Sequence, residues 1–216
     1  MKVRTLESLI DRIDEDLAWR RAELTAFHKA AASTSGSMRS AVLRGSVALL
    51  YAHWEGFVKE AAHLYLCYLS SKRLTLQQLR PEIAGFAMNK ELRPAIESRN
   101  PELHAQVVRS IREGGANRAR IPNDREDVRT ESNLSFRVLS AILASIGIDA
   151  GAYEHQRDLI DGQLVAPRNR IVHGEHETIS LTEWLDLRDS ILGLLREVAD
   201  QIQNSAVEQT YLAWRA

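Results

Sequence analysis

Apolar residues recur every three or four positions along most of this chain, and few residues interrupt the pattern. The 216 residues include only 11 glycines and 5 prolines, and this spacing is typical of helices with one buried face. No stretch alternates between apolar and polar residues as a half-buried strand would. The pattern predicts helices over about 5–31, 38–70, 75–88, 101–112, 133–146, 153–173 and 180–202. We therefore expect an all-α protein, a single-domain helical bundle of about 5–7 helices over residues 1–216.

Glycine and proline mark the expected irregularities. Gly45 and Gly56 lie inside the second predicted helix at a cost in helix propensity, which predicts that another helix approaches closely there. Gly162 and Pro167 predict a bend or break in the helix before the last. Residues 113–132 have no apolar period, and this favours a mobile loop.

Composition limits the classes of function. With 28 basic and 29 acidic residues the net charge is −1, so no overall field draws the protein to nucleic acid or lipid and any anion site must be a local patch. A single cysteine excludes a disulfide framework and suits a reducing compartment. No apolar run approaches the ~20 residues of a membrane helix, and acidic residues from Glu7 onward argue against a signal peptide. We expect a cytoplasmic protein with no membrane partner.

Metal and thiol chemistry find little support. A carboxylate-bridged di-metal bundle needs two Glu-x-x-His pairs, and Glu60 with His63 is the only such pair, so a polar helix edge is the simpler interpretation. Residues 173–177 (HGEHE) lie beside a glycine without a defined helical face, which favours solvation or adventitious metal binding. Cys67 has no nearby cation to lower its pKa, which favours an inert thiol. We expect no metal and no cofactor.

The strongest candidate for chemistry is the segment PRNRIVHG over residues 167–174. Arg168 and His173 have R-x4-H spacing, but this spacing also arises by chance. A second copy at 99–104 is explained by a helix start at Asn100. The residues around each copy therefore decide between them.

Context favours the copy that ends at His173. Ile171 and Val172 are apolar and predict that the segment is anchored in the core. Asn169 and His173 are one helical turn apart on the same face, with Arg168 beside them. A guanidinium, an amide and an imidazole at one place suit a phosphate. The competing interpretation is a plain helix end, where the histidine complements the helix dipole and a glycine caps the last turn.

The segment RNRIVHG resembles the signature of the HEPN superfamily of all-α domains. Further blocks resemble the branch labelled RiboL-PSP-HEPN, and they occur in order between about 45 and 180. They are Tyr51–Lys59 with Tyr65-Leu66, Asn133–Leu139 with Ile146–Asp149, and Ile160-Asp161.

This resemblance implies a metal-independent RNA endonuclease, typically a homodimer and often part of a toxin–antitoxin or antiviral defence system with a protein partner. Arg168 and His173 match the catalytic pair, and Asn169 matches the polar residue that often follows the arginine. Arg170 falls on a variable position. Glu175 stands where some relatives carry a tyrosine that a partner nucleotidyltransferase modifies, which argues against that regulation here.

The chemistry of RNA cleavage is consistent with these residues. The substrate carries its own nucleophile, the 2′-hydroxyl, so the enzyme must move protons and stabilise charge on the phosphorane. A histidine exchanges protons near neutral pH, and an arginine offers a planar fork to phosphate oxygens. One histidine does not easily serve as base and acid in a single step, so we expect a two-fold homodimer that joins two copies of 168–173. The expected products are a 2′,3′-cyclic phosphate and a 5′-hydroxyl.

Supporting roles are more open. Glu55 and Asp161 are candidates to pair with Arg168 or Arg170 and hold the site, although ordinary surface carboxylates need no such role. The predicted loop contributes three candidates for salt-sensitive contacts with the RNA backbone, although a solvated flexible loop is the simpler interpretation. These candidates are Arg112, Arg118 and Arg120.

Two further expectations concern the tryptophans and a different class of function. Trp54, Trp184 and Trp214 are expected to anchor the core or a dimer rather than to stack on bases. The alternative function is a non-catalytic helical dimer that binds a protein partner or a nucleotide, with the motif kept for architecture.

Overall fold

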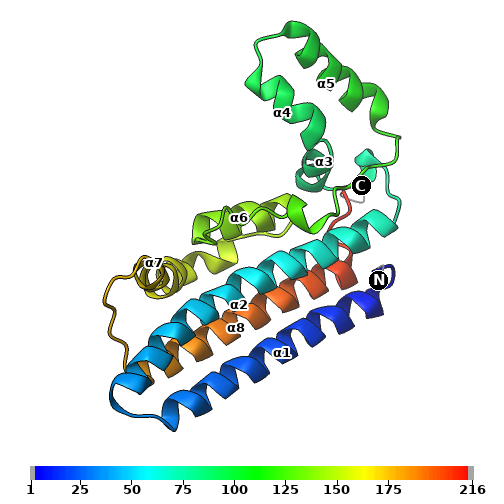
Figure 1. The fold of residues 1–216 in the computed structure, drawn as a ribbon. Helices are drawn as coiled ribbons and strands as arrows, with labels where there is room; N and C mark the ends of the chain where they lie inside the picture. The colour runs from blue at the N-terminus through cyan, green and yellow to red at the C-terminus, as the bar shows by residue number, and fades with distance from the viewer. Residues whose placement is uncertain (1–2, 214–216) are drawn as a thin grey trace.

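The structure is a computed structural model, and it describes residues 3–213. Within that range the chain forms helices and no strand, so the all-α prediction is confirmed (Figure 1). The α-helices are α1 (Leu6–Ala32), α2 (Gly36–Ser71), α3 (Pro81–Ala87), α4 (Asn89–Glu97), α5 (Pro101–Gly114), α6 (Phe136–Ser145), α7 (Ala166–Val172) and α8 (Leu181–Glu208). Shorter segments are the 3-10 turns η1 (Leu76–Gln78), η2 (Arg125–Asp127) and η3 (Gly151–Gln156), and the π-helical η4 (Leu159–Val165).

The described residues hold eight α-helices, one more than the predicted upper number. The pattern of apolar residues does not predict α4, because Pro94 lies inside this short helix and proline removes a backbone donor. The single helix predicted over 75–88 is divided into η1 and α3, and α3 begins at Pro81. Prolines therefore account for both differences.

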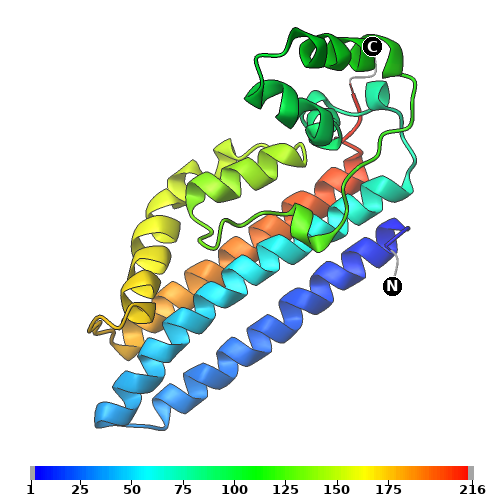
Figure 2. The same ribbon diagram turned by 45° about the horizontal axis from the view of Figure 1, so that its top comes forward.

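Three long helices form the body of the molecule. α1, α2 and α8 pack side by side, and α6 and α7 lie on the opposite side of α2 from α1 (Figures 1 and 2). α2 is the central element, with buried side chains such as Trp54, Phe57 and Tyr65 facing several neighbours. In residues 3–213 no helix has both the length and the apolar character needed to cross a bilayer.

A helical pair projects from this body. α4 and α5 pack against each other, and α3 joins them to α6 (Figures 1 and 2). Several apolar side chains of the pair are exposed, namely Ile96, Val108 and Ile111. The pair stands at the end of the body far from α7 (Figure 1).

Residues 113–132, predicted as a mobile loop, are irregular but held against α2 at several points. Three apolar side chains of this segment are buried, namely Ala119, Ile121 and Val128. Lys59 on α2 pairs with Glu126 at 3.0 Å. These contacts depend on tertiary packing, so the lack of an apolar period gave no indication of them.

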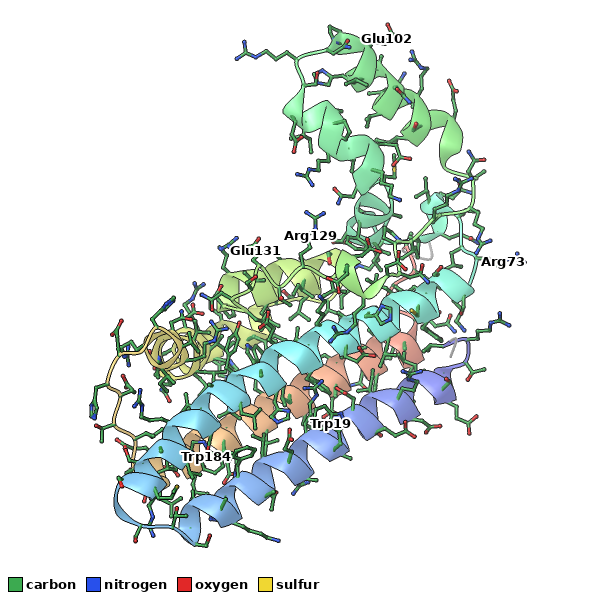
Figure 3. The ribbon with its side chains drawn as sticks, viewed as in Figure 1. Trp19, Arg73, Glu102, Arg129, Glu131 and Trp184 are labelled. Carbon is green, nitrogen blue, oxygen red and sulfur yellow. The ribbon has the colours of Figure 1, made fainter. Side chains whose placement is uncertain are left out.

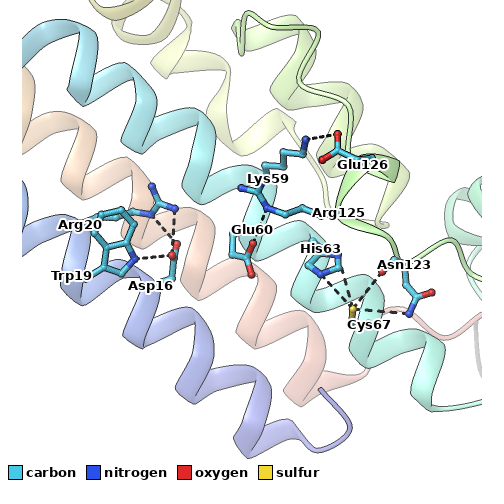
Figure 4. Close-up of polar contacts among 10 residues, drawn as sticks. All are labelled: Asp16, Trp19, Arg20, Lys59, Glu60, His63, Cys67, Asn123, Arg125 and Glu126. Carbon is cyan, nitrogen blue, oxygen red and sulfur yellow. Dashed lines mark hydrogen bonds and ion pairs between the residues drawn. The ribbon is translucent and has the colours of Figure 1, made fainter. Parts of the chain in front are cut away.

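A buried arginine lies at the contact between α1 and α2. Arg20 bonds to both carboxylate oxygens of Asp16 and lies 4.6 Å from the ring centroid of Trp19 (Figure 4). A Cβ atom on Gly56 would lie 2.9 Å from the Arg20 guanidinium, so a larger residue there would force the guanidinium to shift. The expected close approach is thus confirmed at Gly56, although a side chain rather than a helix backbone makes it. No atom lies within 4 Å of a Cβ placed on Gly45.

Candidate functional site

The helix that carries the motif changes from π-helical to α-helical hydrogen bonding just before the motif begins. Residues of η4 form π-helical turns, and α7 follows directly from Ala166. Pro167 has no N–H to donate to the preceding turn, and a wider turn accommodates that loss. The irregularity predicted at Gly162 and Pro167 therefore takes the form of a π segment, and the helix continues through it.

α7 ends in a complete Schellman cap. Gly174 has a φ of +82°, a conformation that favours glycine. Its N–H donates to the Ile171 carbonyl at 3.1 Å, and the Glu175 N–H donates to the Arg170 carbonyl at 2.9 Å. The cap fixes the backbone at His173, which is the C-cap residue of α7. The helix-end interpretation of the motif is therefore correct for its backbone.

One apolar residue of the motif, rather than two, anchors it. Ile171 packs against a small buried cluster of Ala31, Leu43, Val47 and Trp184. Val172 is 51% exposed, so the prediction that it lies in the core is wrong. Adjacent residues on a helix point about 100° apart, and only one of them can face the cluster.

Arg168 is held by an aromatic ring and an amide. Its guanidinium carbon lies 4.2 Å from the ring centroid of Tyr51 on α2, and its Nη1 donates to Asn169 Oδ1 at 2.9 Å. The Tyr51 hydroxyl accepts the Leu134 N–H at 2.7 Å. Burial, and to a smaller extent the Glu55 carboxylate, raise the pKa of Tyr51 to about 12, so the phenol stays neutral.

The two predicted supporting carboxylates do not pair with the motif arginines. Within residues 3–213 no ion pair joins Glu55 or Asp161 to Arg168 or Arg170. Glu55 is half-buried one turn from Tyr51. Asp161 Oδ1 instead accepts the N–H of Phe136, the first residue of α6, at 2.7 Å. A helix start leaves N–H groups without acceptors, and η4 supplies one here.

Arg170 is committed to the segment after the motif. It bonds to both carboxylate oxygens of Glu177, at 2.5 and 3.0 Å, and this contact lowers the pKa of Glu177. Arg44 on α2 donates to the Glu175 carbonyl at 2.9 Å. Neither Arg44 nor Glu177 was predicted, because no local pattern links either residue to the motif. Together these contacts hold the segment that follows His173 against α2 and α7.

Of the three catalytic candidates, Arg168 and Asn169 contact each other through their side chains, whereas no side-chain hydrogen bond joins His173 to either of them. Arg168 and Asn169 are half-buried and joined by their hydrogen bond. His173 is exposed, and its imidazole makes no hydrogen bond to any residue that the structure describes. The site therefore presents a held guanidinium at Arg168 and, five residues further along the chain, an exposed imidazole at His173.

A family model described as HEPN_MAE_28990-like HEPN matches residues 9–211, nearly the whole chain. The chain belongs to this HEPN family. The match confirms the superfamily assignment that RNRIVHG suggested. The family that it names is the MAE_28990-like HEPN family rather than the RiboL-PSP-HEPN branch that the neighbouring blocks resemble. No curated protein and no solved structure gives a significant match.

The three predicted RNA-binding arginines of this HEPN chain lie far from Arg168. Arg118 donates to the Ser70 carbonyl at 3.4 Å, near the end of α2. Tyr51, on which Arg168 stacks, precedes Ser70 by about 28 Å of helix. Arg112 is exposed on α5, in the projecting helical pair, and Arg120 is exposed two residues after Arg118. The structure therefore does not bring these arginines to the HEPN motif.

The other polar groups of α2 form a separate cluster. Glu60 pairs with Arg125 at 3.0 Å, and Cys67 Sγ lies 3.7 Å from His63 Nε2 (Figure 4). Burial raises the pKa of the Cys67 thiol, as expected for an unreactive cysteine. This HEPN chain has no three side chains that converge as metal ligands in residues 3–213.

The described tryptophans of this HEPN chain are of two kinds. Trp54 and Trp184 are fully buried core residues, as expected, and Trp54 Nε1 donates to the Leu134 carbonyl at 3.0 Å. Trp214 lies outside the described residues. Trp19, which was not predicted, lies near the middle of α1 and is 48% exposed (Figure 3).

Proposed function

We propose that this HEPN protein is a cytoplasmic, metal-independent RNA endonuclease in which Arg168 and His173 act on the scissile phosphodiester. The observation that carries the proposal is the state of Arg168. Its guanidinium is half-buried and held by Tyr51 and Asn169, yet no carboxylate among the described residues pairs with it. A held cation without an anionic partner is suited to a phosphate oxygen.

The residues divide the chemistry among them. The 2′-hydroxyl of the substrate attacks the adjacent phosphorus, and the 5′-oxygen leaves with a proton. Arg168 stabilises the charge that develops on the non-bridging oxygens, while the exposed imidazole of His173 transfers a proton. Asn169 keeps one guanidinium N–H occupied and so orients the remaining donors.

A second copy of the chain would supply the second imidazole. One face of α2 beside the motif carries the small exposed residues Ala41, Gly45 and Ala52, at spacings that place them on one side of the helix. Exposed Trp19 and Val172 belong to α1 and α7, which both pack against α2. Small residues allow two helices to approach closely, and a two-fold axis near this face would bring both motifs together.

Cleavage of single-stranded RNA in EDTA tests the chemical proposal. Arg168→Ala and His173→Ala should each abolish cleavage while circular dichroism shows an intact fold. The matched controls are Arg99→Ala and His104→Ala, which have the same R-x4-H spacing and should cleave normally. Undiminished cleavage by both motif variants would mean that another site or a contaminant is responsible.

Two glycines provide a matched test of the dimer. Gly45 on α2 and Gly193 on α8 both lie within helices, and neither has an atom within 4 Å of a placed Cβ. Gly45→Arg should yield a monomer by light scattering and lose cleavage, whereas Gly193→Arg should do neither. A wild-type protein that is monomeric and still cleaves RNA would refute the shared site.

A second candidate function is a non-catalytic HEPN dimer that binds a protein partner or a nucleotide. The complete cap at Gly174 favours it, because the cap gives that end of the motif an architectural role. A dimer that never cleaves RNA would support this function. A toxin or antiviral-defence role, with an antitoxin or other partner protein, is proposed on the family membership alone.

A further inference from the structure

We infer that Tyr51 is a positioning residue that sets the direction of the Arg168 guanidinium before substrate arrives. The inference rests on the proposed function, because it assumes that Arg168 meets the scissile phosphate. It adds a residue on α2 that lies outside the R-x4-H motif.

The stacking geometry restricts how a phosphate can reach Arg168. The guanidinium carbon lies over the Tyr51 ring, 4.2 Å from its centroid, so a phosphate cannot approach Arg168 from the side of the ring. The bond to Asn169 occupies one N–H group. The remaining N–H groups lie along the edge of the fork, where bidentate contact with phosphate oxygens takes place. A free arginine side chain would lose much rotational freedom on binding, and this one has already lost it.

Tyr51 can act in this way because it is itself fixed. Its ring is fully buried and its hydroxyl accepts the Leu134 N–H at 2.7 Å. The Leu134 carbonyl accepts a hydrogen bond from Trp54 Nε1 at 3.0 Å. Leu134, which precedes α6, therefore makes two hydrogen bonds to side chains of α2.

The same short segment also contacts the helix that carries Arg168. Two residues after Leu134, the Phe136 N–H donates to Asp161 of η4 at 2.7 Å. Residues 134–136 thus join the element that supplies Tyr51 to the element that precedes Arg168. Asp161, predicted to pair with an arginine, contributes to this junction instead.

Two substitutions of Tyr51 separate its ring from its hydroxyl. Tyr51→Phe keeps the ring face and should retain most of the cleavage activity. Tyr51→Leu removes the ring and should lower kcat for RNA cleavage about 100-fold, with a smaller change in KM, because a displaced catalytic group loses contacts in the transition state.

Tyr65→Leu is the matched control. Tyr65 is also a buried tyrosine of α2 with a hydrogen-bonded hydroxyl, which lies 2.7 Å from Ser205 Oγ, and it is remote from Arg168. All variants are compared at a temperature where circular dichroism shows them fully folded.

A spectroscopic measurement tests the inference without activity. The Nε–H signal of Arg168 in a nitrogen–proton NMR spectrum should be shifted by the ring current of Tyr51. This shift should persist in Tyr51→Phe and Tyr65→Leu and disappear in Tyr51→Leu. An Arg168 signal that is the same in wild type and Tyr51→Leu overturns the inference, whether or not the protein cleaves RNA.

The activity assay then separates the two proposals. Cleavage by wild type with equal kcat in Tyr51→Leu would refute the role of Tyr51 and leave the ribonuclease proposal standing. A wild type that never cleaves RNA, with the ring-current shift present as described, would refute the ribonuclease proposal alone.

Discussion

Replacement of Asp16 by alanine should destabilise the protein strongly, because it leaves a buried guanidinium without its counter-ion. The side chains of Arg20 and Asp16 are 7% and 16% exposed. Arg20 Nε and Nη2 lie 2.8 and 3.2 Å from the two carboxylate oxygens of Asp16. Trp19 Nε1 donates to the same carboxylate at 2.8 Å (Figure 4). The substitution removes the acceptor for all three bonds.

The size of the effect follows from burial. Removal of one partner from a buried ion pair costs about 3–5 kcal/mol, mainly because the remaining charge stays out of water. A protein of this size has a total stability of about 5–15 kcal/mol. A loss of that size corresponds to a decrease in Tm of about 6–20 °C. The remaining contacts of Arg20, which include the His53 carbonyl at 3.3 Å and the Trp19 ring, do not neutralise its charge.

Urea unfolding followed by circular dichroism measures the loss. Glu15→Ala is the control, because Glu15 is an exposed neighbour on α1 without an ion pair in the described structure, and it should change stability by less than about 0.5 kcal/mol. The double variant Asp16→Leu with Arg20→Met removes both charges and should be more stable than Asp16→Ala. The reasoning fails if Asp16→Ala unfolds at the wild-type urea concentration, or if the double variant is the less stable of the two.

Three other predictions concern stability. Acidification below about pH 6.5 should lower the free energy of unfolding, because the unfolded chain then binds more protons than the folded protein. Burial and, to a smaller extent, the Arg20 charge hold the pKa of His53 below its ordinary value in the folded protein. Urea titrations at several pH values measure this effect, and in His53→Gln the free energy of unfolding should change less steeply with pH. Gly174→Ala should cost about 1–2 kcal/mol in chemical denaturation because of its positive φ, while Gly193→Ala, in an exposed helical position, should be stabilising by up to about 1 kcal/mol. Trp54→Phe should cost about 1–3 kcal/mol in the same assay, because the Leu134 carbonyl loses its buried donor.

Contacts between neighbours in sequence account for what could be predicted of the site. Arg168 and Asn169 lie on one short helix and His173 is its C-cap residue, so the relative placement of their backbones follows from helical geometry. The glycine that ends this helix is also a local signal, because only a residue tolerant of positive φ completes the cap. The bond between Arg168 and Asn169 joins adjacent residues of the same helix.

Contacts between distant segments could not be predicted in the same way. Asp161 carries the charge expected of a partner for arginine, but the start of α6 lies closer and needs an acceptor. Arg170 pairs with Glu177 because the chain turns back after the cap at Gly174. A charged residue has several possible partners in a sequence, and only the packing of helices selects one.

The amino-acid sequence by itself determined the helical class, the end of α7 and the order of the residues in the motif, because periodicity and turn preferences act over a few residues. Tertiary structure alone decided that Tyr51 stacks on Arg168, that the loop arginines lie at the other end of α2, and that the small face of α2 stays exposed. These outcomes depend on which helical faces are buried together, and that choice minimises exposed apolar area over the whole chain at once.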